Sequence, residues 1–361
     1  MRGFYDRDFI EDEKGFIFAV VGSTHPRDRV ISYLKYIPSS RVEKKIWSRS
    51  GVWYERILPY YGARSVLERS CKRILEVCPE YIIYDEVLGT KMIEVPVKAI
   101  AMHYKPEQRL REMLREQRDE LEEITVELVD VIAENTSVPK SEFGVTGSIL
   151  LSIHNPRVSD IDLIVYGLEN SVRVREFLRS DSRIDAGVHR LEGDVLRKYA
   201  LEATKAYPLS LDEALKLYSR DLWNRGVFKG KFFSIHPVLR SWEAPEKYGD
   251  RVYRGLGVVE AECRVCDAKY AMFMPSVYVV DEYRIINTDY KGGIELREVA
   301  SYESVYADIA CEGEWIRVRG KLELVKDLRR GEEYHRVLIG SFEAGGMDYI
   351  KPRHWLENRV L

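Results

Sequence analysis

Two stretches of sequence decide the fold: Phe143-Gly144-Val145-Thr146-Gly147-Ser148 and Ser159-Asp160-Ile161-Asp162-Leu163-Ile164-Val165. The second stretch begins eleven residues after Ser148. The first stretch is predicted to be a short strand that runs into a tight Gly-Ser turn and then a short helix. The second stretch alternates polar and apolar residues at its start, which predicts a strand. Because side chains two positions apart face the same side of a strand, Asp160 and Asp162 are expected to project together.

This pair of aspartates and the Gly-Ser turn together predict a site that binds a metal ion and a phosphate group. Two adjacent carboxylates repel each other unless divalent cations lie between them, and Mg²⁺ or Mn²⁺ prefers such oxygen ligands. A Gly-Ser turn at a helix start lets backbone N–H groups and a hydroxyl approach phosphate oxygens. We therefore expect Asp160 and Asp162 to bind metal, and Gly147 and Ser148 to bind a nucleoside triphosphate (NTP), the substrate.

The two stretches resemble the DNA polymerase beta-like nucleotidyltransferase superfamily. Its pattern is an apolar residue, Gly, Gly or Ser, a gap, and then Asp-apolar-Asp-apolar; Thr146-Gly147-Ser148 and Asp160-Ile161-Asp162-Leu163 match it, with Thr146 in the apolar place. The match is clear over residues 138–165 and looser to residue 240. The resemblance implies an α/β nucleotidyltransferase domain in which the aspartates bind Mg²⁺. The layout of the whole chain also resembles an uncharacterised archaeal group of predicted nucleotidyltransferases, which supplies no substrate.

Members of the superfamily usually carry a third carboxylate on a later strand, and this chain departs from that pattern. The best later strand, residues 231–238, offers Ser234 and His236 where an aspartate would be expected. His236 is a candidate catalytic base because its unperturbed pKa lies near neutrality, or it is a strand-end histidine bonded to backbone. The basic residues around this strand, which form either a phosphate contact or a solvated face, are Arg225, Lys229, Lys231 and Arg240.

The predicted fold class is α+β with three domains. The length of 361 residues exceeds one ordinary core, and 45% hydrophobic residues suffice for packed cores. We expect an N-terminal α+β domain over 1–104, a helical connector with the nucleotidyltransferase domain over 105–245, and a β-rich, barrel-like domain over 246–361. The connector is predicted to be one helix over 106–134. Short apolar runs punctuated by glycine predict the small C-terminal barrel.

Composition excludes some classes of function. A formal net charge of −3 does not favour a protein that coats long nucleic acid nonspecifically. The charged amino terminus has no apolar core of a signal peptide, and no apolar run is long enough to span a membrane, so a cytoplasmic protein without a membrane partner is expected. Many charges with only two glutamines hint at a thermophile.

Two further patterns remain open. Cys263 and Cys266 have the spacing of half a zinc site, but no matching second pair follows, so a local disulfide or two ordinary thiols are the alternatives. A group of aromatic residues could stack nucleic-acid bases or form core. Its members are Trp47, Trp53, Tyr54, Tyr60 and Tyr61.

The sequence therefore predicts an enzyme that transfers a nucleoside monophosphate from an NTP to an acceptor hydroxyl, with pyrophosphate leaving. RNA, a protein and a small molecule remain open as acceptors, and the oligomeric state is open too. The alternative is a catalytically degenerate module that binds nucleotide or RNA, and the missing third carboxylate is its best support. A third alternative is an assembly protein with an accidental motif.

Overall fold

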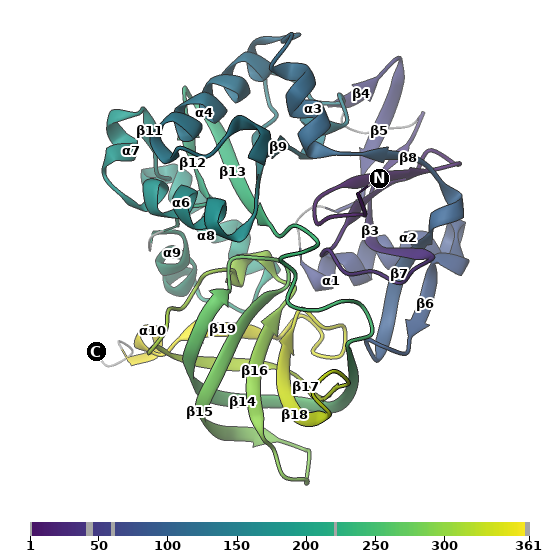
Figure 1. Cartoon of the computed structure of the whole chain (residues 1–361), viewed down its shortest axis with the longest axis vertical. Helices are drawn as coiled ribbons and strands as arrows, with labels where there is room; N and C mark the ends of the chain where they lie inside the picture. The colour runs from purple at the N-terminus through teal and green to yellow at the C-terminus, as the bar shows by residue number, and fades with distance from the viewer. Residues whose placement is uncertain (1, 41–45, 59–61, 220–221, 358–361) are drawn as a thin grey trace. The chain divides into compact units, whose positions relative to one another are not determined.

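The computed structural model describes residues 2–40, 46–58, 62–219 and 222–357. Contacts divide the chain into two compact units, each assembled from separated stretches (Figure 1). The first unit contains Met1–Ile57, Val95–Leu196 and Tyr218–Ala244, and the second contains Leu58–Glu94, Arg197–Leu217 and Pro245–Leu361. The sequence prediction divided the chain linearly, whereas these contacts group residues 1–57 with the motif region.

The first unit begins with an antiparallel sheet that we call the N-terminal sheet. Its strand order is β4-β5-β3-β2-β1-β8. The strands are β1 (Phe9–Asp12), β2 (Ile17–Val20), β3 (Arg29–Pro38), β4 (Trp47–Arg49), β5 (Val52–Arg56) and β8 (Ile100–Tyr104). The short apolar run of residues 15–22 and the alternating run of residues 30–37 are patterns typical of strands, and they form β2 and β3, which pair antiparallel.

The second sheet of this unit carries the motif, and we call it the central sheet. Its order is β11-β12-β13-β10-β9, with β10 parallel to β13 and antiparallel to β9. The strands are β9 (Phe143–Val145), β10 (Ile161–Tyr166), β11 (Val188–His189), β12 (Arg225–Phe228) and β13 (Lys231–Val238). The predicted strand before the Gly-Ser turn, the strand after Asp160 and the later strand over 231–238 are all confirmed.

The single helix predicted over 106–134 is wrong. The chain forms α3 (Pro106–Met113) and α4 (Glu120–Thr136), separated by a short connection. Asp119 causes the second start, because its carboxylate accepts hydrogen bonds from the amides of Leu121 at 3.0 Å and Glu122 at 3.1 Å. The remaining helices of the first unit are α5 (Gly147–Leu150), α6 (Leu168–Arg179) and α7 (Ser182–Asp185), with 3₁₀ turns η3 (Val97–Ala99) and η4 (Lys140–Glu142). Most of α8 (Gly193–Ala206) and α9 (Leu211–Ser219) belongs to the second unit, whose middle stretch is Arg197–Leu217.

Ser210 and Glu213 have the spacing that predicts a capping box, and the structure confirms one at the start of α9. The Ser210 amide donates to the Glu213 carboxylate at 2.8 Å, and the Glu213 amide donates to Ser210 Oγ at 3.2 Å. These two reciprocal bonds satisfy backbone donors that a helix start leaves unpaired. No helix among the described residues has both the length and the apolar character that a membrane crossing requires.

The second unit contains a helical segment, a hairpin and a ring of strands. Residues 63–77, whose apolar spacing is helical, form α1 (Ala63–Ser65), a π-helical turn η1 (Val66–Cys71) and α2 (Lys72–Val77). A 3₁₀ turn, η2 (Pro79–Tyr81), leads into β6 (Ile82–Asp85), which pairs with β7 (Thr90–Pro96).

The carboxy-terminal strands close into the predicted small barrel. They run in the order β14-β15-β16-β18-β17-β19, and an additional pairing between β14 and β17 closes the ring (Figure 1). The elements are β14 (Arg251–Tyr270), β15 (Ser276–Thr288), β16 (Leu296–Ser301), η5 (Ser304–Tyr306), β17 (Trp315–Asp327), β18 (Glu332–Ile339), β19 (Tyr349–Pro352) and α10 (His354–Glu357). β14 is longer than predicted because a bulge between Gly255 and Val258 absorbs the glycines without ending the strand.

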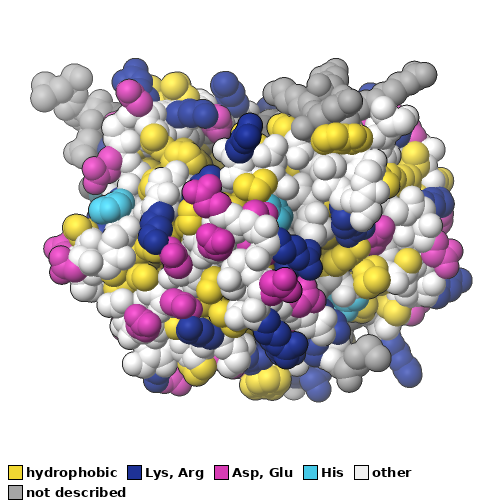
Figure 2. All heavy atoms as spheres, turned by 90° about the horizontal axis from the view of Figure 1, so that it is seen from above, with side chains coloured by type: hydrophobic (Ala, Val, Ile, Leu, Met, Phe, Trp, Pro, Cys, Tyr) yellow, Lys and Arg dark blue, Asp and Glu magenta, His cyan; other side chains and the backbone are white. Residues whose placement is uncertain are grey.

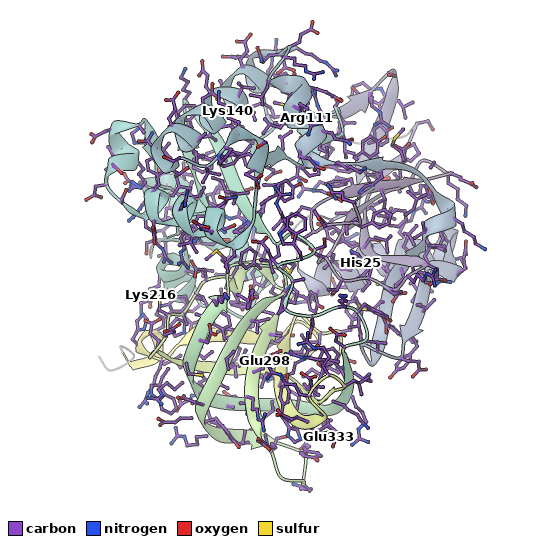
Figure 3. The ribbon with its side chains drawn as sticks, in the orientation of Figure 1. His25, Arg111, Lys140, Lys216, Glu298 and Glu333 are labelled. Carbon is purple, nitrogen blue, oxygen red and sulfur yellow. The ribbon has the colours of Figure 1, made fainter. Side chains whose placement is uncertain are left out.

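The barrel strands also carry a buried ion-pair network. Arg336 Nε donates to Glu323 Oε2 at 2.8 Å, and its guanidinium lies 3.5 Å from the ring centroid of Tyr253. Glu298 on β16 (labelled in Figure 3) accepts from Arg251 at 3.0 Å. Burial without such partners would cost several kcal/mol per charge, so each member depends on the others.

Candidate functional site

The Gly-Ser turn lies directly against Asp162. The Thr146 amide donates to the backbone carbonyl of Asp162 at 2.8 Å, which ties the turn to the start of β10. Gly147 has φ +66°, and a Cβ atom there would lie 2.3 Å from Asp162 Oδ2. Only glycine fits this position, because it tolerates the left-handed backbone and leaves room for the carboxylate.

The loop between α5 and β10 folds back onto the turn. The Ile153 amide donates to the Ser148 carbonyl at 3.1 Å. Ser159 Oγ accepts from the Asn155 amide at 3.0 Å and lies 3.5 Å from Ser148 Oγ. These contacts hold the two motif stretches next to each other, as the sequence predicted.

Asp160 and Asp162 act on each other electrostatically. Asp160 is exposed immediately before β10, and the Asp162 side chain is 26% exposed. Repulsion from the Asp162 carboxylate is the main cause that raises the pKa of Asp160 to about 6. Although burial opposes it, the neighbouring His236, together with Lys35 and Ser234, holds the pKa of Asp162 below its ordinary value. As the pH rises, Asp162 therefore loses its proton first, and Asp160 loses its proton only near pH 6.

A row of polar side chains crosses the central sheet beside Asp162. Ser234 on β13 is the register partner of Asp162 on β10, and Arg225 on β12 is the register partner of Ser234. Cross-strand partners share one face of a sheet, so all three lie on the same side. His236, two positions after Ser234, also belongs to this face. Ser234 is thus the residue of β13 that lies beside Asp162.

Hydrogen bonds connect this row to the motif. Ser234 Oγ donates to Asp162 Oδ1 at 2.5 Å and lies 2.9 Å from His236 Nε2. A carboxylate can only accept, so the serine hydrogen is directed at Asp162, and its oxygen accepts from an Nε2–H of His236. Desolvation and the charge of Arg7 lower the pKa of His236 to about 3. A neutral histidine that donates through Nε2 is a weak base, so the arrangement suits positioning of Ser234 and Asp162 better than proton abstraction.

The donor set fits a divalent cation. Two carboxylates in mutual repulsion gain when a dication neutralises them, and carboxylate oxygens are the ligands that Mg²⁺ and Mn²⁺ prefer. Asp160 and Asp162 would hold such an ion, with Ser234 restricting the orientation of Asp162. A bound cation would favour the charged form of both carboxylates and so lower the raised pKa of Asp160.

The two predicted lysines have other partners. Lys229 forms an ion pair with Glu127 on α4. Lys231 donates to the Pro156 carbonyl at 2.6 Å and so supports the loop that leads to Asp160. The positive charges that act on the aspartates come instead from Lys35 and Arg56, neither of which the sequence analysis named. A lysine inside the apolar alternation of residues 30–37 was the signal that could have identified Lys35.

A second cluster of potential ligands lies in the first unit. His154 Nε2 lies 2.9 Å from Asp119 Oδ2 and 3.9 Å from Glu122 Oε1. Both carboxylates have structural partners, because Asp119 caps α4 and Glu122 pairs with the buried Arg109. This cluster is accounted for as an ion-pair network that anchors the start of α4.

The cysteine and aromatic patterns resolve into ordinary packing. Cys263 is a buried free thiol and Cys266 an exposed one. Trp47 and Tyr54 pack in the core of the N-terminal sheet. Tyr60 and Tyr61 lie outside the described residues.

The fold and the site define a mixed α/β protein with several sheets and an acidic pair set against a Gly-Ser turn. No protein-family model and no solved structure matches the chain. An uncharacterized protein of Methanocaldococcus jannaschii, MJ1086, is 32% identical over 363 residues, which cover 96% of this chain and 98% of that protein. The chain belongs to the same family as MJ1086.

Proposed function

We propose that the chain is a Mg²⁺- or Mn²⁺-dependent nucleotidyltransferase of the polymerase beta-like type, with Asp160, Asp162, Gly147 and Ser148 as its site. The observation that carries the proposal is the contact between Gly147 and the Asp162 carboxylate, within 2.3 Å of where a Cβ would stand. This close approach supports the proposal, because a metal-bound triphosphate requires a phosphate-binding turn next to a carboxylate that binds the cation.

In the proposed reaction, an acceptor hydroxyl oxygen forms a bond to the α-phosphorus of the NTP. The bond from that phosphorus to the bridging oxygen breaks, and pyrophosphate and the hydroxyl proton are released. A bound cation supplies neutralisation of the phosphate charge. The chain itself orients Asp162 through Ser234 and His236, and the backbone at Gly147 and Ser148 seats the phosphates.

A catalytically degenerate nucleotide-binding module is the second candidate. Ser234 in register with Asp162 favours it, because a neutral hydroxyl cannot replace a third carboxylate as base or metal ligand of equal strength. This candidate predicts cation-dependent NTP binding without product.

RNA is one candidate for the acceptor of the nucleoside monophosphate. Small barrels bind oligonucleotides through loops and one sheet face, which supports RNA, but a fold does not establish such a role. Figure 2 shows one face of the molecule on which described basic and acidic side chains are interspersed. On that face the described residues form no extended basic track of the kind that binds long nucleic acid.

Transfer of label from an α-labelled NTP tests the proposal. The purified chain is incubated with each NTP and Mg²⁺ or Mn²⁺, with total RNA, with a panel of small hydroxyl compounds, or alone. We expect product and pyrophosphate from the natural chain and none from the Asp160→Ala/Asp162→Ala double variant, whose fold is checked by circular dichroism. Binding without product supports the second candidate, and equal turnover by the double variant refutes the assignment.

A further inference from the structure

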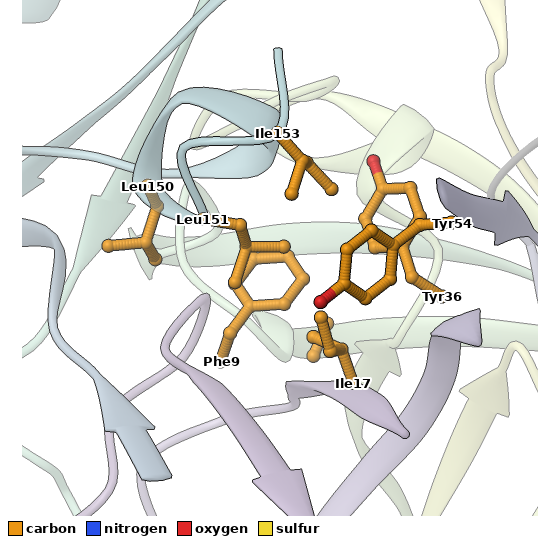
Figure 4. Packing of buried hydrophobic residues seen from close by; sticks show 8 residues of the cluster. Phe9, Ile17, Tyr36, Tyr54, Leu150, Leu151 and Ile153 are labelled. Carbon is orange, nitrogen blue, oxygen red and sulfur yellow. The ribbon is translucent and has the colours of Figure 1, made fainter. Parts of the chain in front are cut away.

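The N-terminal sheet is fixed to the segment that directly follows Gly147 and Ser148. Its aromatic and aliphatic side chains pack against the end of α5 and the next loop in one buried cluster (Figure 4). The labelled members are Phe9, Ile17, Tyr36 and Tyr54 from the sheet, and Leu150, Leu151 and Ile153 from the other side. The Ser48 amide also donates to the Ile153 carbonyl at 3.2 Å. Within the first unit, the N-terminal sheet therefore packs directly against the segment that follows Gly147 and Ser148.

Lys35 is placed by an irregularity of β3. In the pairing with β2, Ile17 opposes Tyr36 and Phe18 opposes Leu34, which leaves Lys35 as the extra residue of a bulge. A bulge re-aims the side chain of the extra residue. Lys35 is 6% exposed, and its Nζ lies 4.8 Å from the ring centroid of Phe9. A charge buried in this way interacts strongly with the charged groups near it.

Arg56 lies on the same side of this sheet as the packed aromatic residues. It is the register partner of Tyr36 in the pairing of β5 with β3, and Tyr54 is two positions before it. Both tyrosines contact the segment after α5, so Arg56 extends from the face that the Gly-Ser helix packs against. Its guanidinium carbon lies 5.8 Å from the ring centroid of Trp47, which limits its freedom.

Packing places the two basic side chains on the side of the motif. Lys35 lies against the rings of Phe9 and Tyr36, and Arg56 lies against the ring of Trp47. These rings pack on the segment that directly follows Ser148, next to the turn that contacts Asp162. A divalent cation bound to the aspartates would be repelled by both basic side chains. A polyphosphate that contacts the cation and the two basic side chains together removes this repulsion, and phosphate is a preferred partner of arginine and lysine.

We infer that Lys35 and Arg56 bind the β- and γ-phosphates of the NTP, so that the N-terminal sheet forms part of the nucleotide site. This inference rests on the proposed function and assigns triphosphate recognition to residues outside the Gly-Ser and Asp-Ile-Asp motif. In this assignment the motif provides the turn and the carboxylates that bind the cation. The bulge on β3 provides a positive charge, Lys35, for the phosphates.

Calorimetric titrations with Mg²⁺ alone, Mg²⁺ with a non-hydrolysable NTP, and Mg²⁺ with the matching NMP test this assignment. Lys35→Met keeps the apolar stem against Phe9 while removing the charge, and Arg56→Gln is the companion variant. We expect each to weaken NTP binding about tenfold or more and NMP binding by less than about threefold. Lys35→Arg should restore part of the loss. Lys98→Met, which removes an exposed charge from the same unit, is the matched control and should match the natural chain.

Binding of Mg²⁺ alone separates this role from a structural one. Loss of a nearby positive charge should leave Mg²⁺ affinity equal or increase it, whereas a distorted site would bind Mg²⁺ more weakly. The inference is overturned if Lys35→Met binds NTP within about twofold of the natural chain while Asp160→Ala/Asp162→Ala does not bind. It is also overturned if Lys35→Met weakens Mg²⁺ and NTP binding in parallel. If the natural chain does not bind Mg²⁺ with NTP at all, the proposed function fails as well.

Discussion

Gly147→Ala is the substitution whose effect can be worked out most fully. The residue has φ +66°, a conformation that costs alanine roughly 1–2 kcal/mol. The new Cβ would also lie 2.3 Å from Asp162 Oδ2, so the carboxylate must rotate away and lose its bond from Ser234. A hydrogen bond to a charged group contributes roughly 1.5–3 kcal/mol. We expect a total loss of about 2.5–5 kcal/mol in the free energy of unfolding.

Two comparisons isolate the contact from the backbone effect. Gly230 has φ +76° and nothing within 4 Å of an added Cβ, so Gly230→Ala should cost only the backbone penalty. In an Asp162→Ala background the obstructing oxygen is absent, so Gly147→Ala should also cost only about 1–2 kcal/mol. Urea unfolding followed by fluorescence and circular dichroism gives these values where both transitions coincide. Equal costs for Gly147→Ala and Gly230→Ala, or the same cost in both backgrounds, would refute the reasoning.

The remaining predictions concern charge. The raised pKa of Asp160 means that between about pH 4 and 6 the folded protein holds a proton that the unfolded chain has lost, so this group makes the free energy of unfolding fall as pH rises through that window. Asp162→Asn should return the pKa of Asp160 towards its ordinary value, measured by carboxyl NMR titration, and an unchanged value of about 6 would contradict the repulsion. Mg²⁺ affinity should increase from pH 5 to 7 in calorimetry, because the cation binds the deprotonated pair; a flat profile would count against it. Ser234→Ala should weaken Mg²⁺ binding about tenfold, because Asp162 loses the hydrogen-bond donor that orients it. An unchanged Mg²⁺ affinity would show that Ser234 does not position Asp162 for metal binding. In the barrel, Arg336→Met should cost roughly 3–5 kcal/mol in thermal unfolding because Glu323 loses one of its two buried basic partners, the other being Lys321. Removing the partly exposed Arg264 by Arg264→Met should leave the unfolding midpoint unchanged, and equal midpoints for the two variants would contradict the network.

Local patterns predicted the elements that local physics determines. The Ser210–Glu213 capping box, the strand before Gly147 and the strand after Asp160 follow from residues within a few positions of each other. The break at Asp119 also has a local cause, but the apolar periodicity on both sides of it was continuous and predicted one helix.

Long-range packing decided what the sequence could not show. Strand alternation made Asp160 and Asp162 candidates, but the approach of Lys35 depends on a bulge and on a sheet formed more than a hundred residues earlier in the chain. Lys229 and Lys231 were predicted as phosphate ligands because they lie at the start of β13. In the folded chain Lys229 forms an ion pair with Glu127, and Lys231 donates to the Pro156 carbonyl. Ser234 could be placed on the later strand, but its register with Asp162 required the sheet.

Anomalous scattering from a crystal soaked with Mn²⁺ and a non-hydrolysable NTP tests the central claim most directly. We predict a manganese peak bonded to carboxylate oxygens of Asp160 and Asp162, with the triphosphate against Gly147 and Ser148. Manganese bound instead to Asp119, Glu122 and His154, with no density at the aspartate pair, would contradict the assignment of the site.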